Sequence, residues 1–374
     1  MPTSSVQNPD RVDVIVVGGG VIGLACAWRA AERGLSIVVL ERQRPGAGAS
    51  NVAAGMLAPV GEATWGEDRL LELAIGSHRL WPRFAADLAA ATGRDPGYLE
   101  LGALHVALDR DEAAELRRRY ELMASHDLGA DWLLPSACRE LEPGLGPVAG
   151  GVHAAHEAAA DPRALNDCLV AALDAAGGTV EIAEVTAALI ENGRLAGVRT
   201  ADGYERRAGA VVLAAGSWSA ADWLPPPARP AVRPVKGQIL TLRGPAAEPP
   251  CERILVTERV YIVPRRDGRL LVGATVEEQG FDTQVTAGGV HELLREAYRA
   301  LPEIAELEFV EAAAGLRPTT PDNLPLIGRG AIEGLVLATG HFRNGILLAP
   351  LTAERIASWL VAERRVPHVA GVTG

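Results

Sequence analysis

Three glycines near the start of the chain have the spacing of a loop that binds phosphate groups. Gly18, Gly20 and Gly23 form the pattern G-x-G-x-x-G. The first permits a tight turn, the second lets the backbone approach a pyrophosphate, and the third lets a helix pack closely on a strand. Glu41 follows at the distance where an acidic side chain accepts hydrogen bonds from ribose hydroxyls. Since this carboxylate would repel a 2′-phosphate, the sequence predicts a dinucleotide site that disfavours NADP.

The segments around these glycines predict the strand–helix–strand unit that such a site needs. Residues 12–17 are mostly apolar and β-branched, as in a buried parallel strand. A helical stretch follows over residues 21–33, with Gly34 as its stop signal. Residues 36–40 predict a second strand that ends at Glu41. The helix N-terminus would offer unpaired N–H groups to the phosphates, and the motif alone leaves NAD and FAD open.

Two further stretches are rich in small residues. Residues 44–56 consist largely of Gly, Ala and Ser, which fits either a flexible loop or a backbone packed against a large flat ligand. Residues 211–218 read as a buried strand that ends at Gly216, where the backbone could approach a cofactor closely. Both stretches are therefore candidate walls of the same site.

Side chains that could bind a small carboxylate occur in the second half of the chain. Arg317 presents a planar fork of donors that fits a carboxylate, with an interdomain salt bridge as the alternative. Tyr261 lies in a predicted hairpin that turns at residues 267–268, and simple packing is its alternative. Arg343 lies in a polar turn that leads into an apolar helix, and it could instead cap local carbonyls.

Taken together, these stretches resemble the D-amino-acid oxidase superfamily of FAD enzymes, and within it the glycine oxidases associated with thiamine (thiazole) synthesis. The resemblance covers the chain from Val12 to about Leu360. Its most specific segments are residues 315–318 and 340–350. The other segments that carry it are the N-terminal strand–helix–strand unit and residues 53–56, 234–237 and 261–265.

The resemblance implies roles for two sets of residues. Arg317 would bind the substrate carboxylate, and Tyr261 and Arg343 would face the same pocket. Arg259 and Val276 stand where relatives have His and Met, which leaves the size and charge of the preferred amine open. With Gly18, Gly20, Gly23 and Gly216 from the motifs, the residues expected at the FAD are Val21, Ile22, Leu40, Glu41, Gly48, Ala49, Ala53, Ala54, Gly55, Met56, Val185, His341, Phe342, Arg343, Asn344, Gly345, Ile346 and Leu347.

The activity implied by the resemblance is the FAD-dependent oxidation of glycine and related small amines or D-amino acids. The products would be a 2-oxo acid, ammonia and hydrogen peroxide, with molecular oxygen as acceptor and thiamine biosynthesis as the purpose. The alternatives are a D-amino-acid dehydrogenase or a sarcosine-type oxidase of the same superfamily, an NAD-linked reductase, and a non-enzymatic nucleotide-binding subunit. Some sarcosine oxidases attach their flavin through a cysteine in the C-terminal part. The last cysteine here is Cys251, so non-covalent FAD is expected.

The element pattern predicts a mixed α/β fold: a Rossmann-like FAD-binding domain interleaved with a substrate-binding domain on a mostly antiparallel sheet. Further helices are expected over residues 70–91, 111–126, 162–176 and 291–300, and a strand with a kink at Gly102 over 99–108. Residues 1–10 are expected to be disordered. The FAD-binding domain is expected to comprise residues 12–84, 151–225 and 312–365, and the substrate-binding domain residues 85–150 and 226–311.

Composition limits the partners of this chain. Its 374 residues carry a net charge of −11, so neither nucleic acid nor anionic lipid is attracted overall. The four cysteines form no C-x-x-C pair, which favours a reduced, cytoplasmic protein. His153 and His156 lie three apart without further ligands at zinc spacing, so no metal is expected. A small amine substrate and oxygen are the expected partners, and a homo-oligomer stays open.

Overall fold

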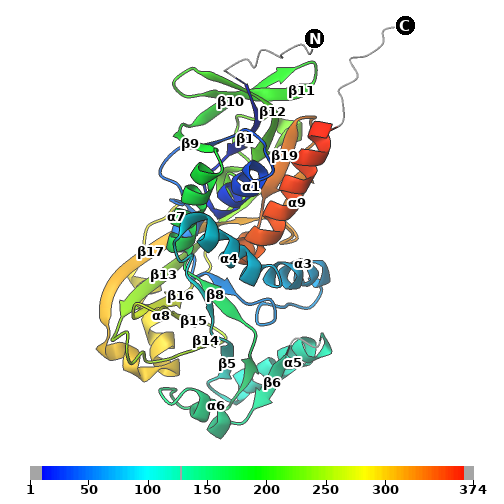
Figure 1. Cartoon of the computed structure of the whole chain (residues 1–374). Helices are drawn as coiled ribbons and strands as arrows, with labels where there is room; N and C mark the ends of the chain where they lie inside the picture. Colours follow the sequence, from blue (N-terminus) through cyan, green and yellow to red (C-terminus); the bar gives the residue numbers. More distant parts are fainter. Residues whose placement is uncertain (1–10, 127–128, 366–374) are drawn as a thin grey trace.

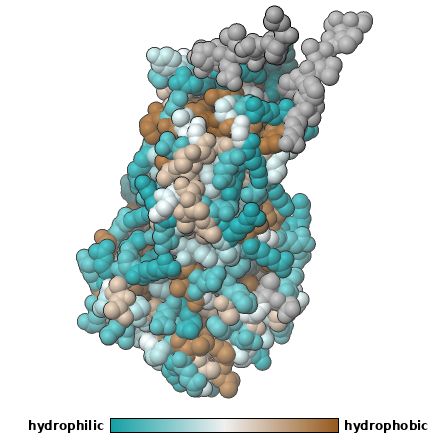
Figure 2. Space-filling model, in the orientation of Figure 1, coloured by the Kyte–Doolittle hydropathy of each residue, from teal (hydrophilic) through white to brown (hydrophobic). Residues whose placement is uncertain are grey.

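The computed structural model describes residues 11–126 and 129–365. The segment expected to be disordered, residues 1–10, lies outside the described residues. The strands form two eight-stranded sheets and one three-stranded sheet. The larger sheets occupy the upper and lower parts of the molecule in Figure 1. The face in Figure 2 is mostly hydrophilic with smaller apolar patches.

The first sheet has a parallel centre built from strands that lie far apart in the sequence. Its order is β10-β11-β12-β1-β2-β9, and β19 and β18 extend it from β12. The parallel pairs are β1 with β2, β1 with β12, β2 with β9, and β12 with β19. The strands are β1 (Arg11–Val17), β2 (Ile37–Glu41), β9 (Thr179–Ile182), β10 (Val185–Glu191), β11 (Arg194–Thr200), β12 (Glu205–Leu213), β18 (Leu326–Arg329) and β19 (Leu335–Thr339).

Helices pack against this sheet and complete the main core. Every residue of α1 (Val21–Ala31) is buried, and α1 packs against α7 (Pro162–Ala175) and α9 (Gly345–Arg365). Figure 1 shows α9, in red, beside α1, in blue. By length and composition α9 could cross a membrane, but 61% of its apolar window is buried inside the protein. Its apolar residues therefore serve as core.

The second large sheet is mostly antiparallel. Its order is β17-β13-β16-β15-β14-β5-β7-β6, and only the β14–β5 pair is parallel among its described strands. The strands are β5 (Ala103–Ala107), β6 (Ala130–Leu133), β7 (Gly150–Ala154), β13 (Arg233–Arg243), β14 (Ile254–Val256), β15 (Tyr261–Pro264), β16 (Arg269–Gly273) and β17 (Glu308–Thr319). The helices α5 (Arg110–Ser125), α6 (Pro135–Leu141) and α8 (Ala287–Ala300) accompany it. A small sheet of β3 (Met56–Leu57), β8 (Ala158–Ala160) and β4 (Tyr98–Glu100) completes the fold.

The mixed α/β fold class is confirmed, and two predicted elements are wrong. Residues 70–91 form two helices, α3 (Asp68–His78) and α4 (Trp81–Thr92), because Pro82 fits only the first turn of a new helix. The strand expected over 99–108 is two strands, since Gly102 has a left-handed φ of +67° and sends β4 and β5 into different sheets.

Other expectations are confirmed. Asp161 caps α7 by accepting hydrogen bonds from two backbone N–H groups, and the Tyr261 hairpin forms as β15 and β16. The division into two domains stays a prediction. By sheet membership, β7 and β17 join the mostly antiparallel sheet, although their residues fall mainly in ranges expected to belong to the FAD-binding domain.

Candidate functional site

A cavity of about 1060 Å³ lies at the carboxyl ends of the parallel strands. Its wall includes Val17 at the end of β1, Glu41 at the end of β2 and Thr339 at the end of β19. Arg317, from β17 of the second large sheet, lines it as well. Pockets for drug-sized ligands measure roughly 300–1,000 Å³, so this cavity has the size that a large ligand such as a dinucleotide requires. Binding at this edge of a parallel sheet is the rule for open α/β sheets.

The glycine motif forms a cradle without room for side chains. Gly18 has a φ of +108°, and a Cβ there would overlap the carbonyl oxygen of Ala214. A Cβ on Gly23 would overlap the carbonyl oxygen of Gly18, so Gly23 serves the packing of α1 on β1. Ser50 accepts a hydrogen bond from the first N–H of α1, that of Val21, at 3.0 Å. The cradle therefore fits a pyrophosphate at the N-terminus of α1.

Glu41 is held by the backbone at the end of β2. Its Oε2 accepts a hydrogen bond from the N–H of Gly19 at 2.7 Å, and its Oε1 accepts one from the N–H of Gln43 at 2.9 Å. A carboxylate has about four acceptor positions. Glu41 therefore retains capacity for ribose hydroxyls while its orientation is fixed.

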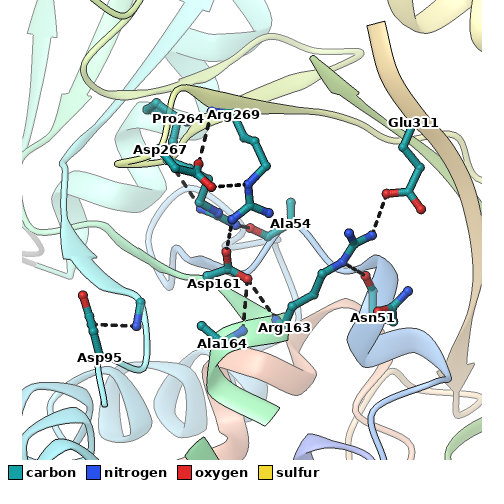
Figure 3. Close-up of polar contacts among 12 residues, drawn as sticks. Asn51, Ala54, Asp95, Asp161, Arg163, Ala164, Pro264, Asp267, Arg269 and Glu311 are labelled. Carbon is teal, nitrogen blue, oxygen red and sulfur yellow. Dashed lines mark hydrogen bonds and ion pairs between the residues drawn. The ribbon is translucent and has the colours of Figure 1, made fainter. Parts of the chain in front are cut away.

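The small-residue segment after β2 is ordered rather than a flexible loop, because charged side chains hold its backbone. Arg163 donates from Nε to the carbonyl of Asn51 at 3.2 Å and from Nη2 to Glu311 at 2.8 Å (Figure 3). Arg265 donates from Nη2 to the carbonyl of Ala54. Since α7, β17 and the region after β15 supply these groups, the second large sheet and a helix packed against α1 together position the backbone that lines the cavity.

Asp161 links this network to the hairpin. It caps α7 and also pairs with Arg269 on β16 at 2.6 Å (Figure 3). Burial would raise the pKa of Asp161, but Arg265 and Arg269 outweigh it and hold the pKa below its usual value. Burial in turn lowers the pKa of Arg265 to about 10. Both groups are therefore charged near neutral pH.

His341 lies at the opposite wall, where η4 (Phe342–Asn344) leads into α9. Its Nε2 is 3.0 Å from the hydroxyl of Thr352. Burial lowers the pKa of His341 to about 3, so the ring is neutral at physiological pH. The wall here consists of a neutral imidazole and the N-terminus of α9. A neutral ring suits a flat, electron-accepting ligand better than a charged imidazolium beside the positive end of the helix dipole would.

Arg317 is held against a glycine and two backbone carbonyls. Its Nη1 donates to the carbonyl of Lys236 at 3.3 Å and to that of Thr275 at 3.1 Å. Gly237 lies against the guanidinium, and a Cβ there would overlap both terminal nitrogens. Burial raises the pKa of the Tyr261 hydroxyl, and the positive charge of Arg317 opposes that rise. The interdomain salt-bridge alternative for Arg317 finds no support among these contacts.

Arg343 contacts a glutamate that sequence reasoning missed. Its Nε is 3.2 Å from Oε2 of Glu62, and its Nη2 donates to the Glu62 carbonyl at 3.2 Å. Thus Arg343 does bond a local carbonyl, which was its alternative role, while it also lines the cavity. Tyr261 lines the cavity too, so the three residues expected at the substrate lie in one cavity.

The cavity brings together most of the residues expected at the FAD. Gly23, Asn344 and Leu347 do not line it: Gly23 packs within α1, Asn344 is buried, and the Leu347 carbonyl accepts bonds from Ser77 and Trp81. Those that line it are Gly18, Gly20, Val21, Ile22, Leu40, Glu41, Gly48, Ala49, Ala53, Ala54, Gly55, Met56, Val185, Gly216, His341, Phe342, Arg343, Gly345 and Ile346.

Several lining residues were missed. Ser50, Glu62, His105 and Arg119 come from separate segments. Ser50 lies inside the small-residue stretch, so a polar side chain near the helix N-terminus was a signal that could have found it. For the other three no local signal exists, since contacts between distant segments bring them to the cavity.

Comparison with known proteins agrees with this geometry. The family model described as FAD dependent oxidoreductase (DAO) matches residues 13–359. The chain belongs to this family. As a member of the FAD-dependent oxidoreductases it uses FAD, which the cradle, Glu41 and the size of the cavity fit, and the NAD-linked alternative no longer applies.

Individual relatives of this FAD-dependent oxidoreductase are similar over nearly its whole length. It is 39% identical over 361 residues to the bifunctional protein ThiO/ThiG of Trichormus variabilis, covering 95% of this chain and 53% of that protein. The chain therefore spans about half the length of such bifunctional relatives. It is 36% identical to the glycine oxidase of Geobacillus kaustophilus over 352 residues, covering 93% and 92% of the two chains.

Solved structures show the same fold. The crystal structure of glycine oxidase from Geobacillus kaustophilus matches with a TM-score of 0.87 at 36% identity, covering 96% of each chain. The iminodiacetate oxidase of Chelativorans sp. BNC1 matches with a TM-score of 0.84 at 27% identity, covering 93% of this chain and 95% of the other.

Proposed function

We propose that this protein oxidises glycine, and related small amines or D-amino acids, to the 2-oxo acid, ammonia and hydrogen peroxide. The observation that carries the proposal is the position of Arg317, whose planar guanidinium suits a carboxylate, in the same cavity as the dinucleotide cradle. The similarity to glycine oxidase over more than nine-tenths of both chains supports the choice of substrate.

The residues of the chain act by binding and orienting the substrate. Arg317 holds the carboxylate, and its backbone partners and Gly237 keep the guanidinium in place. Tyr261, which lines the same cavity, forms the adjacent wall. FAD, which the glycine cradle and Glu41 would hold, would supply the hydride acceptor for oxidation of the amine to an imine, with oxygen as the final electron acceptor. Water then converts the imine to glyoxylate and ammonia when glycine is the substrate.

The cavity mouth sets the range of amines. Arg259 and Val276 both line the cavity, and Val276 is 70% exposed. Arg259 adds positive charge to the cavity wall, which favours a substrate with a second acidic group more than a bulky apolar one. Glycine, sarcosine and iminodiacetate are therefore informative members of one substrate panel.

The proposal is tested by hydrogen peroxide formation from glycine, sarcosine, iminodiacetate, D-alanine and D-proline. Peroxide from glycine is the expected result, with FAD in the purified protein shown by its absorbance. Activity that requires an artificial acceptor and yields no peroxide would move the enzyme to the D-amino-acid dehydrogenases. Activity with sarcosine alone would indicate a sarcosine-type oxidase.

Further features support the cellular setting that we propose. Cys26, Cys138, Cys168 and Cys251 are free and buried, as is usual in the reducing cytoplasm. None of these four described cysteines lines the cavity, which supports non-covalent FAD. A role in thiamine biosynthesis rests on the similarity to the ThiO/ThiG protein.

A further inference from the structure

Glu62 lies in the cavity wall with an oxygen that has no donor. Its Oε2 is 3.2 Å from Nε of Arg343, but that oxygen is buried and has no hydrogen-bond partner in the described part of the chain. The Glu62 side chain is 24% exposed and the residue lines the cavity, so a ligand can reach the carboxyl group although Oε2 itself is buried. The ion pair with Arg343 offsets part of the cost of burying this oxygen, and a hydrogen-bond donor on a ligand would offset more.

The peptide before Glu62 is clamped by buried charged groups. The N–H of Gly61 donates to Oε1 of Glu157, and its carbonyl accepts from Nη2 of Arg119. Oε2 of Glu157 is 3.3 Å from Nε2 of His105, and both side chains are about 1% exposed. A Cβ on Gly61 would overlap the His105 ring. Burying charged side chains costs free energy. Here Glu157, His105 and Arg119 together fix the backbone that carries Glu62.

Charges around Glu62 connect it to the substrate end of the cavity. Burial raises the pKa of Glu62, and Glu157 adds to the rise, whereas Arg343, Arg317 and Arg119 oppose it. Glu62 and Arg317, the arginine proposed to bind the carboxylate, line the same cavity. The negative charge of Glu62 and the positive charge of Arg317 therefore face a common space.

We propose that Glu62 accepts a hydrogen bond from the amino group of the substrate whose carboxylate is bound by Arg317. This inference rests on the proposed function. An α-amino acid carries its amine and its carboxylate on one carbon, so a pocket that recognises both groups needs an acceptor close to the arginine. An ammonium and a neutral amine both have N–H groups to donate, so the bond persists when the amine loses a proton. Glu62 thereby selects amino acids over simple carboxylates.

The test compares Glu62→Gln with the wild type, using FAD-loaded enzyme and two ligands. The apparent Kd for glycine is measured from anaerobic flavin reduction, and the Kd for acetate, which has no amine, from the change in flavin absorbance. Loss of a charge-assisted bond is expected to weaken glycine binding roughly 10-fold or more. Acetate binding should be unchanged or tighter, because removing a negative charge leaves Arg343 free to attract the carboxylate.

Other outcomes overturn the proposal. Equal weakening of glycine and acetate would show that Glu62 only supports the shape of the pocket, and unchanged glycine binding would show that it does not contact the amine. If Glu62→Gln loses FAD, Glu62→Asp, which keeps the charge with a shorter reach, should weaken glycine selectively. Glu72→Gln, on an exposed position of α3, is the matched control and should change neither constant.

The same series separates this inference from the proposed function. Failure of the wild type to oxidise any amine of the panel would refute the function, and the role of Glu62 with it. Glycine oxidation by the wild type with parallel changes in both constants would refute the role of Glu62 alone.

Discussion

The contact between Gly237 and Arg317 allows the substrate arginine to be displaced without being removed. A Cβ on Gly237 would lie 2.3 Å from both terminal nitrogens of Arg317. Non-bonded atoms prefer roughly 3.5–4.0 Å, so in Gly237→Ala the guanidinium must move by about 1 Å or more. The moving group is the end of a flexible side chain, and Gly237 is not in the left-handed region. The fold should therefore tolerate the change.

The expected loss follows from the displacement. A misplacement of about 1 Å can cost about 100-fold in activity, and a hydrogen bond to a charged group contributes about 1.5–3 kcal/mol. Gly237→Ala should therefore raise the KM for glycine by about 10- to 100-fold. The FAD content should stay the same, because the cradle and Glu41 lie on the other large sheet.

Peroxide assays, flavin absorbance and thermal unfolding measure these effects. Gly288→Ala is the matched control, since Gly288 lies in α8 and a Cβ there meets no atom within 4 Å. A double-mutant cycle with Arg317→Ala adds a second check, because the two changes act on one group and should not be additive. An unchanged KM in Gly237→Ala, or fully additive losses, would refute the placement of Arg317 at the carboxylate.

Three more results are expected. Arg317→Ala should raise the KM for carboxylate substrates sharply with FAD still bound, and unchanged kinetics would remove Arg317 from the site. The pKa of His341 falls from 6.5 to about 3 on folding, so the free energy of unfolding should decrease by about 1.4 kcal/mol per pH unit as the pH falls below about 6.5. Urea titrations at two pH values should show a smaller decrease for His341→Gln than for the wild type. Equal decreases would contradict a neutral His341 in the folded protein. Because its pKa is lowered in the fold, ionised Asp161 stabilises the protein above about pH 4, and this contribution is lost as the pH falls. In the same urea titrations, Asp161→Asn should unfold in less urea than the wild type at pH 7. Its stability should decrease less than that of the wild type on acidification.

Local sequence signals predicted the parts of the site that depend on local backbone geometry. The spacing of Gly18, Gly20 and Gly23 and the alternation of strand and helix around them predicted the cradle. Gly23 meets Gly18 within the same unit, and Gly18 meets Ala214 directly after the adjacent strand β12. The helix break before α4 was also predictable, since a proline such as Pro82 is favoured in the first turn of a helix and disfavoured further along it. The prediction of one long helix over residues 70–91 followed the apolar residues and gave too little weight to this proline.

The polar end of the cavity could not be predicted in this way. Gly61 and Glu157 are 96 residues apart, and Gly61 and Arg119 are 58 apart. Each has an ordinary local context, and only the pairing of strands from distant segments makes them neighbours. In the sequence, Glu62 cannot be distinguished from any other loop glutamate. Its role becomes apparent only from the contacts of Gly61 with Glu157 and Arg119.

The packing of α1 on α9 has a consequence for the synthesis of the protein. All of α1 is buried in the finished fold, but α9 begins at Gly345, more than 300 residues after α1 ends at Ala31. At about 5–20 residues per second, the ribosome needs roughly 15–60 seconds to make that interval. Throughout this period an apolar helix lacks its final cover, so the nascent chain is expected to depend on chaperones, and its yield should be sensitive to translation speed.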